Sequence, residues 1–179
     1  VDDRPMTWPV LETATEYETG WYDGGYDRVE QPDGTTKRYY WAELPDAVIV
    51  VAVDGDDVLF VEQYRPTVRR ECLELPAGIV EDGESYVAAA RRELEEETGL
   101  APRSVELLQT FDVATGVLRH ERGIVAATDL QPGTRNLDDN EFLTVTRVPR
   151  EQAIDRAREL PANDATIEGL LLAAQDGYL

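Results

Sequence analysis

Residues 78–100, "GIVEDGESYVAAARRELEEETGL", place the strongest constraint on how this chain folds. The pattern predicts a loop followed by a helix from about Ser85 to Thr98, and Gly99 is the residue type that commonly ends a helix. At about 100° per residue, Val87, Ala90 and Leu94 fall on one narrow face of that helix. We therefore expect this face to be buried.

The acidic residues of the same helix break a local electrostatic rule. Glu93, Glu96 and Glu97 fall within an arc of roughly 100°, at the end of the helix where the dipole is negative. One interpretation is a solvated acidic face, with Arg91 and Arg92 as partial counterions. The other is a divalent-cation site, because hard oxygen ligands one helical turn apart can share Mg²⁺.

Strand and helix signals on both sides of this stretch predict a mixed α/β fold. Residues 47–53 read as a buried strand, and after a turn at 54–57 a second strand returns over 58–63. Further strand-like segments and two closing helices follow, at 105–111, 123–127, 142–148, about 150–159 and about 164–176. The last helix carries Ile167, Leu170, Leu171 and Ala174 at helical spacing.

Residues 1–46 form a different kind of segment, made of short aromatic stretches broken by turn signals. Stretches 26–29 and 38–44 flank Pro32-Asp33-Gly34, which reads as a hairpin turn. A β-hairpin of this size is not stable alone, so we expect it to pack on the core or on a partner chain. The predicted organisation is an N-terminal β extension, residues 1–46, and a main domain, residues 47–179.

Composition excludes several functional classes. The formal net charge is −20, from 37 acidic and 17 basic residues, and the acids are spread along the chain. This charge disfavours nucleic-acid binding, and the longest apolar run, residues 47–53, is too short to span a membrane. Lys37 is the only lysine, which together with the acidity indicates a halophile's protein, whose self-repulsion is screened at molar salt. The single cysteine, Cys72, cannot form an internal disulfide, so we expect a cytoplasmic location.

The spacing of residues 78–100 decides between the two interpretations of the acidic helix. Gly78 is followed after five residues by Glu84, and seven residues later by Arg92-Glu93-Leu94; one residue then precedes Glu96-Glu97, and another precedes Gly99-Leu100. This long pattern resembles the Nudix box, and the chain is similar to Nudix hydrolases. The resemblance implies an α/β/α sandwich around a mixed β-sheet and hydrolysis of a nucleoside diphosphate linked to another group.

The resemblance also implies roles for individual residues. Glu93 and Glu97 would be the principal metal ligands, Glu96 a further or water-mediated ligand, and Gly78 a backbone carbonyl ligand. Arg92 would orient a glutamate through a charge-assisted hydrogen bond, whereas Glu84 would fix the junction of loop and helix. The expected ion is Mg²⁺, with Mn²⁺ as an alternative, because a divalent cation neutralises the pyrophosphate and activates water.

Upstream residues resemble the ADP-ribose pyrophosphatase branch of this family. These are Glu62-Gln63-Tyr64-Arg65 and Glu74-Leu75-Pro76-Ala77-Gly78. The resemblance implies that Arg65 contacts the substrate, with Glu74 and Glu121 as further substrate-binding residues, and that the N-terminal hairpin pairs with a second subunit in a homodimer. The products would be AMP and ribose 5-phosphate.

Two features of the second half bear on substrate and mechanism. Many ADP-ribose enzymes carry Ser-Pro-Gly after the box, but Ala114-Thr115-Gly116 stands in that place here. In the ADP-ribose branch the general base lies on an acidic loop before a late strand, so the resemblance implies a base among Asp138, Asp139 and Glu141, just before residues 142–148. Glu141 is the first choice; the alternative is Asp139 as base with Glu141 as an extra metal ligand. Glu121, which lies outside this loop, is third. Three alternatives stay open: another nucleoside diphosphate sugar, a dinucleoside polyphosphate as substrate, or a nucleotide sensor without catalysis.

Overall fold

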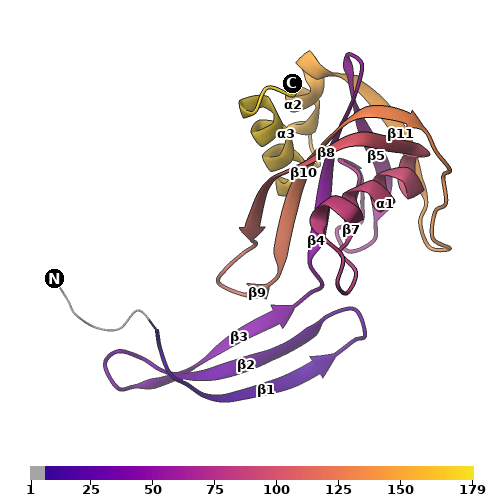
Figure 1. Cartoon of the computed structure of the whole chain (residues 1–179). Helices are drawn as coiled ribbons and strands as arrows, with labels where there is room; N and C mark the ends of the chain where they lie inside the picture. The colour runs from indigo at the N-terminus through magenta and orange to yellow at the C-terminus, as the bar shows by residue number, and fades with distance from the viewer. Residues whose placement is uncertain (1–6) are drawn as a thin grey trace. The chain divides into compact units, whose positions relative to one another are not determined.

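The apolar run after Ala47 becomes β4 (Ala47–Asp54), whose side chains alternate between two separate cores. Val48, Val50 and Ala52 pack with α1 (Tyr86–Thr98) on one face of the sheet. Ile49, Val51 and Val53 face the opposite core, which contains residues of α2 (Arg150–Ala157) and α3 (Asp164–Gln175). Because successive strand residues point to opposite faces, one buried strand can serve two helical layers (Figure 1).

The sheet around β4 has seven strands and mixed direction. Its main path runs β11-β5-β4-β10-β8, while β6 pairs with β5 and β7 pairs with β4. β10 runs parallel to β4, and the β4–β5, β5–β11, β5–β6 and β4–β7 pairs are antiparallel. The bounds are β5 (Asp57–Arg65), β6 (Arg70–Glu74), β7 (Ala77–Ile79), β8 (Leu100–Asp112), β10 (Glu121–Pro132) and β11 (Leu143–Pro149). The predicted α/β/α sandwich around a mixed sheet is confirmed.

The computed structural model describes residues 7–179 and divides into two units. The larger unit contains residues 46–111 and 122–179, and the smaller contains residues 112–121 together with the N-terminal segment up to residue 45. Residues 1–6 of the predicted extension lie outside the described part of the chain.

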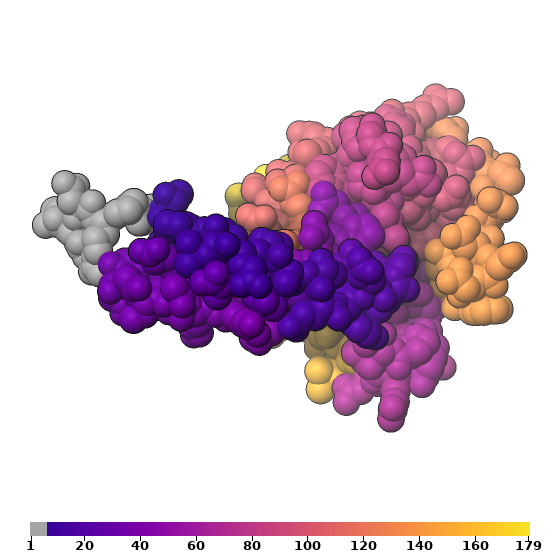
Figure 2. All heavy atoms as spheres, turned by 90° about the horizontal axis from the view of Figure 1, so that it is seen from below, coloured from indigo at the N-terminus to yellow at the C-terminus, as the bar shows by residue number. Residues whose placement is uncertain are grey.

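The smaller unit is a four-stranded sheet in the order β1-β2-β3-β9. β1 (Val10–Glu18), β2 (Asp23–Glu30) and β3 (Thr36–Glu43) are antiparallel neighbours, and β9 (Leu118–Arg119) joins β3 in parallel. The predicted turn lies between β2 and β3, where Gly34 donates its backbone N–H to Gln31 and the Asp33 carboxylate accepts from Thr35. Figure 2 shows this unit, in indigo and purple, as an elongated surface of side chains.

Apolar side chains of the smaller unit stay largely exposed. Among its described hydrophobic residues, Tyr26 and Val29 are the buried ones. Trp21 is 62% exposed, Tyr17 58% and Tyr40 57%, although some rings pair with each other, such as Tyr17 with Tyr22. A sheet without a core of its own needs another surface to cover it.

Several elements differ from the sequence-based expectation. β1 was not predicted, because a strand exposed along almost its whole length shows no alternation of apolar and polar residues. β6 and β7 were not predicted either, and β8 begins at Leu100 rather than near residue 105. In α3, Leu171 is 52% exposed although it stands at helical spacing with Ile167, Leu170 and Ala174, and the buried residues are Thr166, Gly169, Leu170 and Ala173. No helix within residues 7–179 is both long enough and apolar enough to cross a membrane.

Candidate metal and substrate site

Helix α1 is fixed at both ends by the residues that the sequence indicated. The Ser85 side chain accepts a hydrogen bond from the Ala88 backbone N–H at 3.2 Å, which caps the N-terminus. Gly99 adopts a left-handed conformation with φ of 74° and donates its N–H to the Glu95 carbonyl. The predicted helix is confirmed, and its apolar residues Ala89, Ala90 and Leu94 pack in the core against the sheet.

Two of the helix's glutamates point inward. Glu93 is 8% exposed and Glu97 2% exposed, beside the fully buried Leu94. Glu96 is more open, with 36% of its side chain exposed. The solvated-face interpretation is therefore wrong for Glu93 and Glu97.

Backbone from β7 closes tightly over this pair. A Cβ atom on Gly78 would lie 1.9 Å from Cδ of Glu93, so only glycine permits this approach. One residue earlier, the Ala77 N–H donates to Oε2 of Glu97 at 3.2 Å. Residues 77 and 78 thus contact the two buried carboxylates directly.

Burial makes both carboxylates hard to ionise. It raises the pKa of Glu97 to about 8, and the nearby charge of Glu93 adds to the shift. Burial also raises the pKa of Glu93, although the Arg92 guanidinium opposes it. The charge of Glu141 disfavours ionisation of both groups. Two buried acids with too little compensating charge form a site suited to a cation.

Arg92 links the loop, β7 and the helix. Its Nε and Nη2 atoms donate to the two oxygens of Glu84 at 3.2 and 2.9 Å. Its Nη1 donates to Glu93 at 2.7 Å and to Glu96 at 3.2 Å, and Nη2 also donates to the Ile79 carbonyl. The hydrogen bond from Arg92 lowers the pKa of Glu84, whose other contact is the Glu81 N–H. Glu84 therefore ties the loop to the helix, and Arg92 holds Glu93 and Glu96.

Arg135 offsets the negative end of α1 and was missed in the sequence. Its Nε donates to the Glu97 carbonyl at 2.8 Å, and its Nη2 donates to the Leu143 carbonyl at 2.8 Å. Asn136 donates its backbone N–H to the Glu96 carbonyl at 3.0 Å. These donors satisfy the last carbonyls of the helix. They also attach the start of β11, and the loop before it, to the end of α1.

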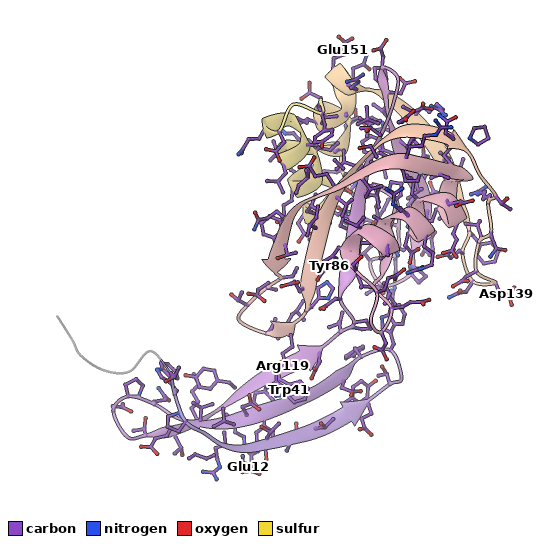
Figure 3. All side chains as sticks on the ribbon, viewed as in Figure 1. Glu12, Trp41, Tyr86, Arg119, Asp139 and Glu151 are labelled. Carbon is purple, nitrogen blue, oxygen red and sulfur yellow. The ribbon has the colours of Figure 1, made fainter. Side chains whose placement is uncertain are left out.

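That loop carries the acids expected to include the general base. Glu141 is partly buried, and its Oε2 accepts the Asp138 backbone N–H at 3.1 Å. Asp139 is exposed, and Figure 3 shows it at the outer turn of the loop. Glu121 begins β10 and belongs to the smaller unit. Of the three, Glu141 is the one whose charge reaches Glu93 and Glu97.

Arg65 and Glu74 form a second polar cluster. Glu74 is 9% exposed, and its Oε2 accepts from Nε and Nη2 of Arg65 at 2.9 and 2.6 Å and from Gln63 at 3.0 Å. Its Oε1 accepts from Asn163 at 3.0 Å. The positive charge of Arg65 favours the ionised form of Glu97. Arg65 therefore lies within electrostatic reach of the buried carboxylates.

Comparison with known proteins identifies this arrangement. The NUDIX domain family matches residues 43–170. The chain belongs to the Nudix family. The predictions of a Nudix fold and of a Nudix hydrolase are confirmed.

Individual relatives of this Nudix chain cover most of its length. It is 33% identical over 140 residues to an ADP-ribose pyrophosphatase of Bacillus subtilis, which covers 76% of each chain. It is 32% identical over 136 residues to a methanol dehydrogenase activator of Bacillus methanolicus, which covers 74% of each. A crystal structure of an ADP compounds hydrolase has a TM-score of 0.87 over 97% of this chain and 98% of that chain, at 24% identity, which shows a common fold.

The Nudix box residues fit a hard divalent cation chemically. Glu93 and Glu97 supply paired carboxylate oxygens, and the recorded partner of the Glu97 carboxylate is a neutral N–H rather than a cation. Within residues 7–179, no three Asp, Glu, His or Cys side chains already converge as a set of ligands. Glu96 is directed to Arg92, so it would have to turn to join the pair. Oxygen-only donors of this kind suit Mg²⁺ or Mn²⁺.

The smaller unit of this Nudix protein holds another cluster that was missed in the sequence. Arg119 stacks on Trp41 at 4.1 Å from the ring centroid and pairs with Asp27 at 2.6 Å, and Figure 3 shows Trp41 and Arg119 close together. His120 lies next to it, with Nδ1 2.8 Å from the Pro45 carbonyl oxygen, a contact that holds the loop. Residues 112–121 are distant from β3 in sequence, so no local pattern could have paired them.

Proposed function

We propose that this Nudix hydrolase is an Mg²⁺-dependent ADP-ribose pyrophosphatase that yields AMP and ribose 5-phosphate. The observation that carries the proposal is the buried pair Glu93 and Glu97, closed over by Gly78 and within electrostatic reach of Arg65. The similarity to an ADP-ribose pyrophosphatase over 76% of the chain supports this substrate over a dinucleoside polyphosphate.

Residues of the Nudix box would hold the metal. Glu93 and Glu97 would be the principal ligands, the Gly78 carbonyl and Glu96 further ones, and Mn²⁺ an alternative to Mg²⁺. When bound, the ion supplies positive charge that neutralises the pyrophosphate, polarises its phosphorus–oxygen bonds and activates water. Arg92 orients Glu93 through the 2.7 Å bond between Nη1 and Oε1.

Arg65 would bind the diphosphate of the substrate. Its Nε and Nη2 are taken by Glu74, and among the described residues no hydrogen-bond acceptor takes Nη1, which leaves a donor for a phosphate oxygen. For Glu74 we propose a supporting role beside the expected substrate contact, because both of its oxygens already accept hydrogen bonds from the protein.

The hydrolysis adds water across the pyrophosphate bond. A new bond forms between the water oxygen and one phosphorus, the bridging phosphorus–oxygen bond breaks, and the bridging oxygen leaves on the other phosphate. A general base must take the proton from water, and a carboxylate that holds a metal is a poor acceptor. We assign this role first to Glu141, whose charge reaches the pair, then to Asp139 and Glu121.

The smaller unit would complete the active assembly as part of a homodimer. Its exposed aromatic residues, including Trp21 and Tyr40, are of the type that packs in subunit interfaces. We propose that they contribute to dimer and substrate contacts.

A substrate panel tests the proposed function. ADP-ribose, other nucleoside diphosphate sugars and diadenosine polyphosphates are incubated with the protein and Mg²⁺ in molar KCl, and the products are separated by chromatography. We expect ADP-ribose to give the highest kcat/KM, with AMP and ribose 5-phosphate as products. Preference for a dinucleoside polyphosphate, or no turnover of any compound, would contradict the proposal.

A further inference from the structure

The first turn of α3 holds residues 74–78, the segment that bonds Arg65 at one end and contacts Glu93 and Glu97 at the other. Asn163, the N-cap of α3, donates its side-chain N–H to Oε1 of Glu74 at 3.0 Å. The Thr166 hydroxyl accepts the backbone N–H of Leu75 at 3.2 Å. Two successive residues, 74 and 75, are therefore fixed by one helix end.

The same segment continues directly into the metal site. After Leu75 and Pro76, the Ala77 N–H bonds to Glu97, and Gly78 packs against Glu93. A displacement of Glu74 would move Arg65 relative to these carboxylates, because two of the guanidinium's donor atoms are bonded to Glu74.

Asn163 uses its side chain in two directions. Its Oδ1 accepts the Thr166 backbone N–H at 2.8 Å, which is the helix cap, and its Nδ2 is the donor to Glu74. Serine or aspartate would serve the capping function alone equally well. The amide carries its acceptor and its donor on two separate atoms, so it can bond the helix and the Glu74 carboxylate in two directions at once, which the single oxygen of a serine hydroxyl is too short to do.

We propose that Asn163 is a positioning residue for substrate binding: through Glu74 it fixes the guanidinium of Arg65 in the orientation that receives the substrate's diphosphate. This inference rests on the proposed role of Arg65. Asn163 is assigned no contact with substrate or metal, and it acts by holding Oε1 of Glu74, the carboxylate oxygen that Arg65 does not bond. The relay Asn163–Glu74–Arg65 spans α3, β6 and β5.

The test compares two substitutions that keep the helix cap and remove the donor. Asn163→Ser removes the Nδ2 donor, and Asn163→Asp places an acceptor oxygen against the carboxylate of Glu74. With ADP-ribose in molar KCl, we expect Asn163→Ser to raise KM roughly three- to tenfold, because the variant loses the one hydrogen bond that positions Glu74. Asn163→Asp should raise KM further, because its carboxylate repels that of Glu74. kcat should stay within about twofold of wild type in both.

Asp164→Asn is the matched control. Asp164 lies at the same helix end, but its carboxylate contacts Arg122 and the Ala165 N–H. Its KM should equal that of wild type. Melting temperatures of all variants, measured in the same buffer, separate a loss of folded protein from a loss of positioning.

A double substitution distinguishes positioning from a general structural effect. Arg65→Gln should raise KM by itself, and adding Asn163→Asp to it should change KM by less than about twofold, because the positioned group is gone. The inference is overturned if Asn163→Asp leaves KM unchanged, or if it raises KM equally in the Arg65→Gln background. If Arg65→Gln leaves KM unchanged, the relay and the role of Arg65 both fail, whereas hydrolysis by the wild-type protein still decides the proposed activity.

Discussion

At the scale of single residues, the least favourable feature of the fold is the burial of Glu97. Its pKa of about 8 means that the carboxyl prefers to be neutral in the folded, metal-free protein, mainly because of burial and then because of the charge of Glu93. A side chain that weakens the metal-free fold is expected where function requires it. The burial of Glu97 therefore fits a ligand better than a structural residue.

Glu97→Gln should stabilise the metal-free protein above neutral pH. A carboxyl with a raised folded-state pKa contributes stability that is fully present below its ordinary pKa of 4.5 and is lost as pH rises through about 8. Glutamine mimics the neutral form, so the melting temperature of Glu97→Gln in EDTA should exceed that of wild type by about 3 °C or more at pH 8.5 and converge with it near pH 5. Glu71→Gln, at an exposed position, is the control. A difference that is independent of pH would contradict the shifted pKa.

The general base is tested by three amide substitutions in parallel, Glu141→Gln, Asp139→Asn and Glu121→Gln. Loss of a real base should lower kcat by roughly 10²–10⁴-fold with little change in KM. We expect this result for Glu141→Gln, because its charge reaches Glu93 and Glu97 whereas Asp139 lies at the outer turn of the loop. If all three keep kcat within about threefold of wild type, the base lies elsewhere.

At the scale of elements, the C-terminus of α1 and the start of β11 are held together by Arg135. The guanidinium bridges the carbonyls of Glu97 and Leu143, so it links the helix that carries the buried pair to the loop that carries Glu141. Arg91 makes comparable contacts on another side of the helix, with the carbonyls of Pro102 and Arg103. Substituting each arginine in turn therefore separates an effect on stability, which both should show, from an effect on catalysis, which only Arg135 should show.

Arg135→Gln should lower kcat, whereas Arg91→Gln should not. Both substitutions remove contacts to two carbonyls, and each should lower the melting temperature by a few degrees. Only Arg135→Gln releases the loop before β11, and we expect its kcat to fall roughly three- to tenfold. Equal kcat values for the two variants would show that Arg135 serves stability alone.

The sequence predicted those parts of the fold and site that depend on local patterns. Helix α1 with its start near Ser85 and its stop at Gly99, strand β4 and the β2–β3 turn all follow from periodicity and turn chemistry. The bond of Arg135 to Glu97 and that of Asn163 to Glu74 could not be predicted, because these partners lie 38 and 89 positions away in the chain. The buried face of α3 could not be read from its apolar spacing, because Leu170, Leu171 and Leu172 cover more than one face, and the buried residues are Thr166, Gly169, Leu170 and Ala173.

At the scale of the whole molecule, the excess of acid is the dominant property. A net charge of −20 on 179 residues creates repulsion that weakens a fold in dilute buffer. The exposed aromatic residues of the smaller unit add a surface that we expect a partner subunit to cover. Salt screens the repulsion within one chain and the repulsion between two chains that associate through this surface.

Salt should therefore stabilise both the fold and the dimer. We expect the melting temperature to rise by roughly 10 °C between dilute buffer and molar KCl, because the Debye length falls to about 3 Å. Light scattering over the same series should give the mass of a dimer at molar KCl. A flat or falling melting curve would contradict the halophile interpretation, and a fully active monomer would contradict the dimer.

Turnover of ADP-ribose by Glu93→Gln and Glu97→Gln, compared with wild type at saturating Mg²⁺, tests most directly whether the buried pair holds the catalytic metal. Each substitution removes one metal-binding charge and preserves the shape of the site. We expect wild-type turnover to cease in EDTA, and each variant to lose at least about 10²-fold in kcat while it still binds ADP-ribose in a titration. Near-wild-type turnover by either variant would show that the pair is not the catalytic metal site.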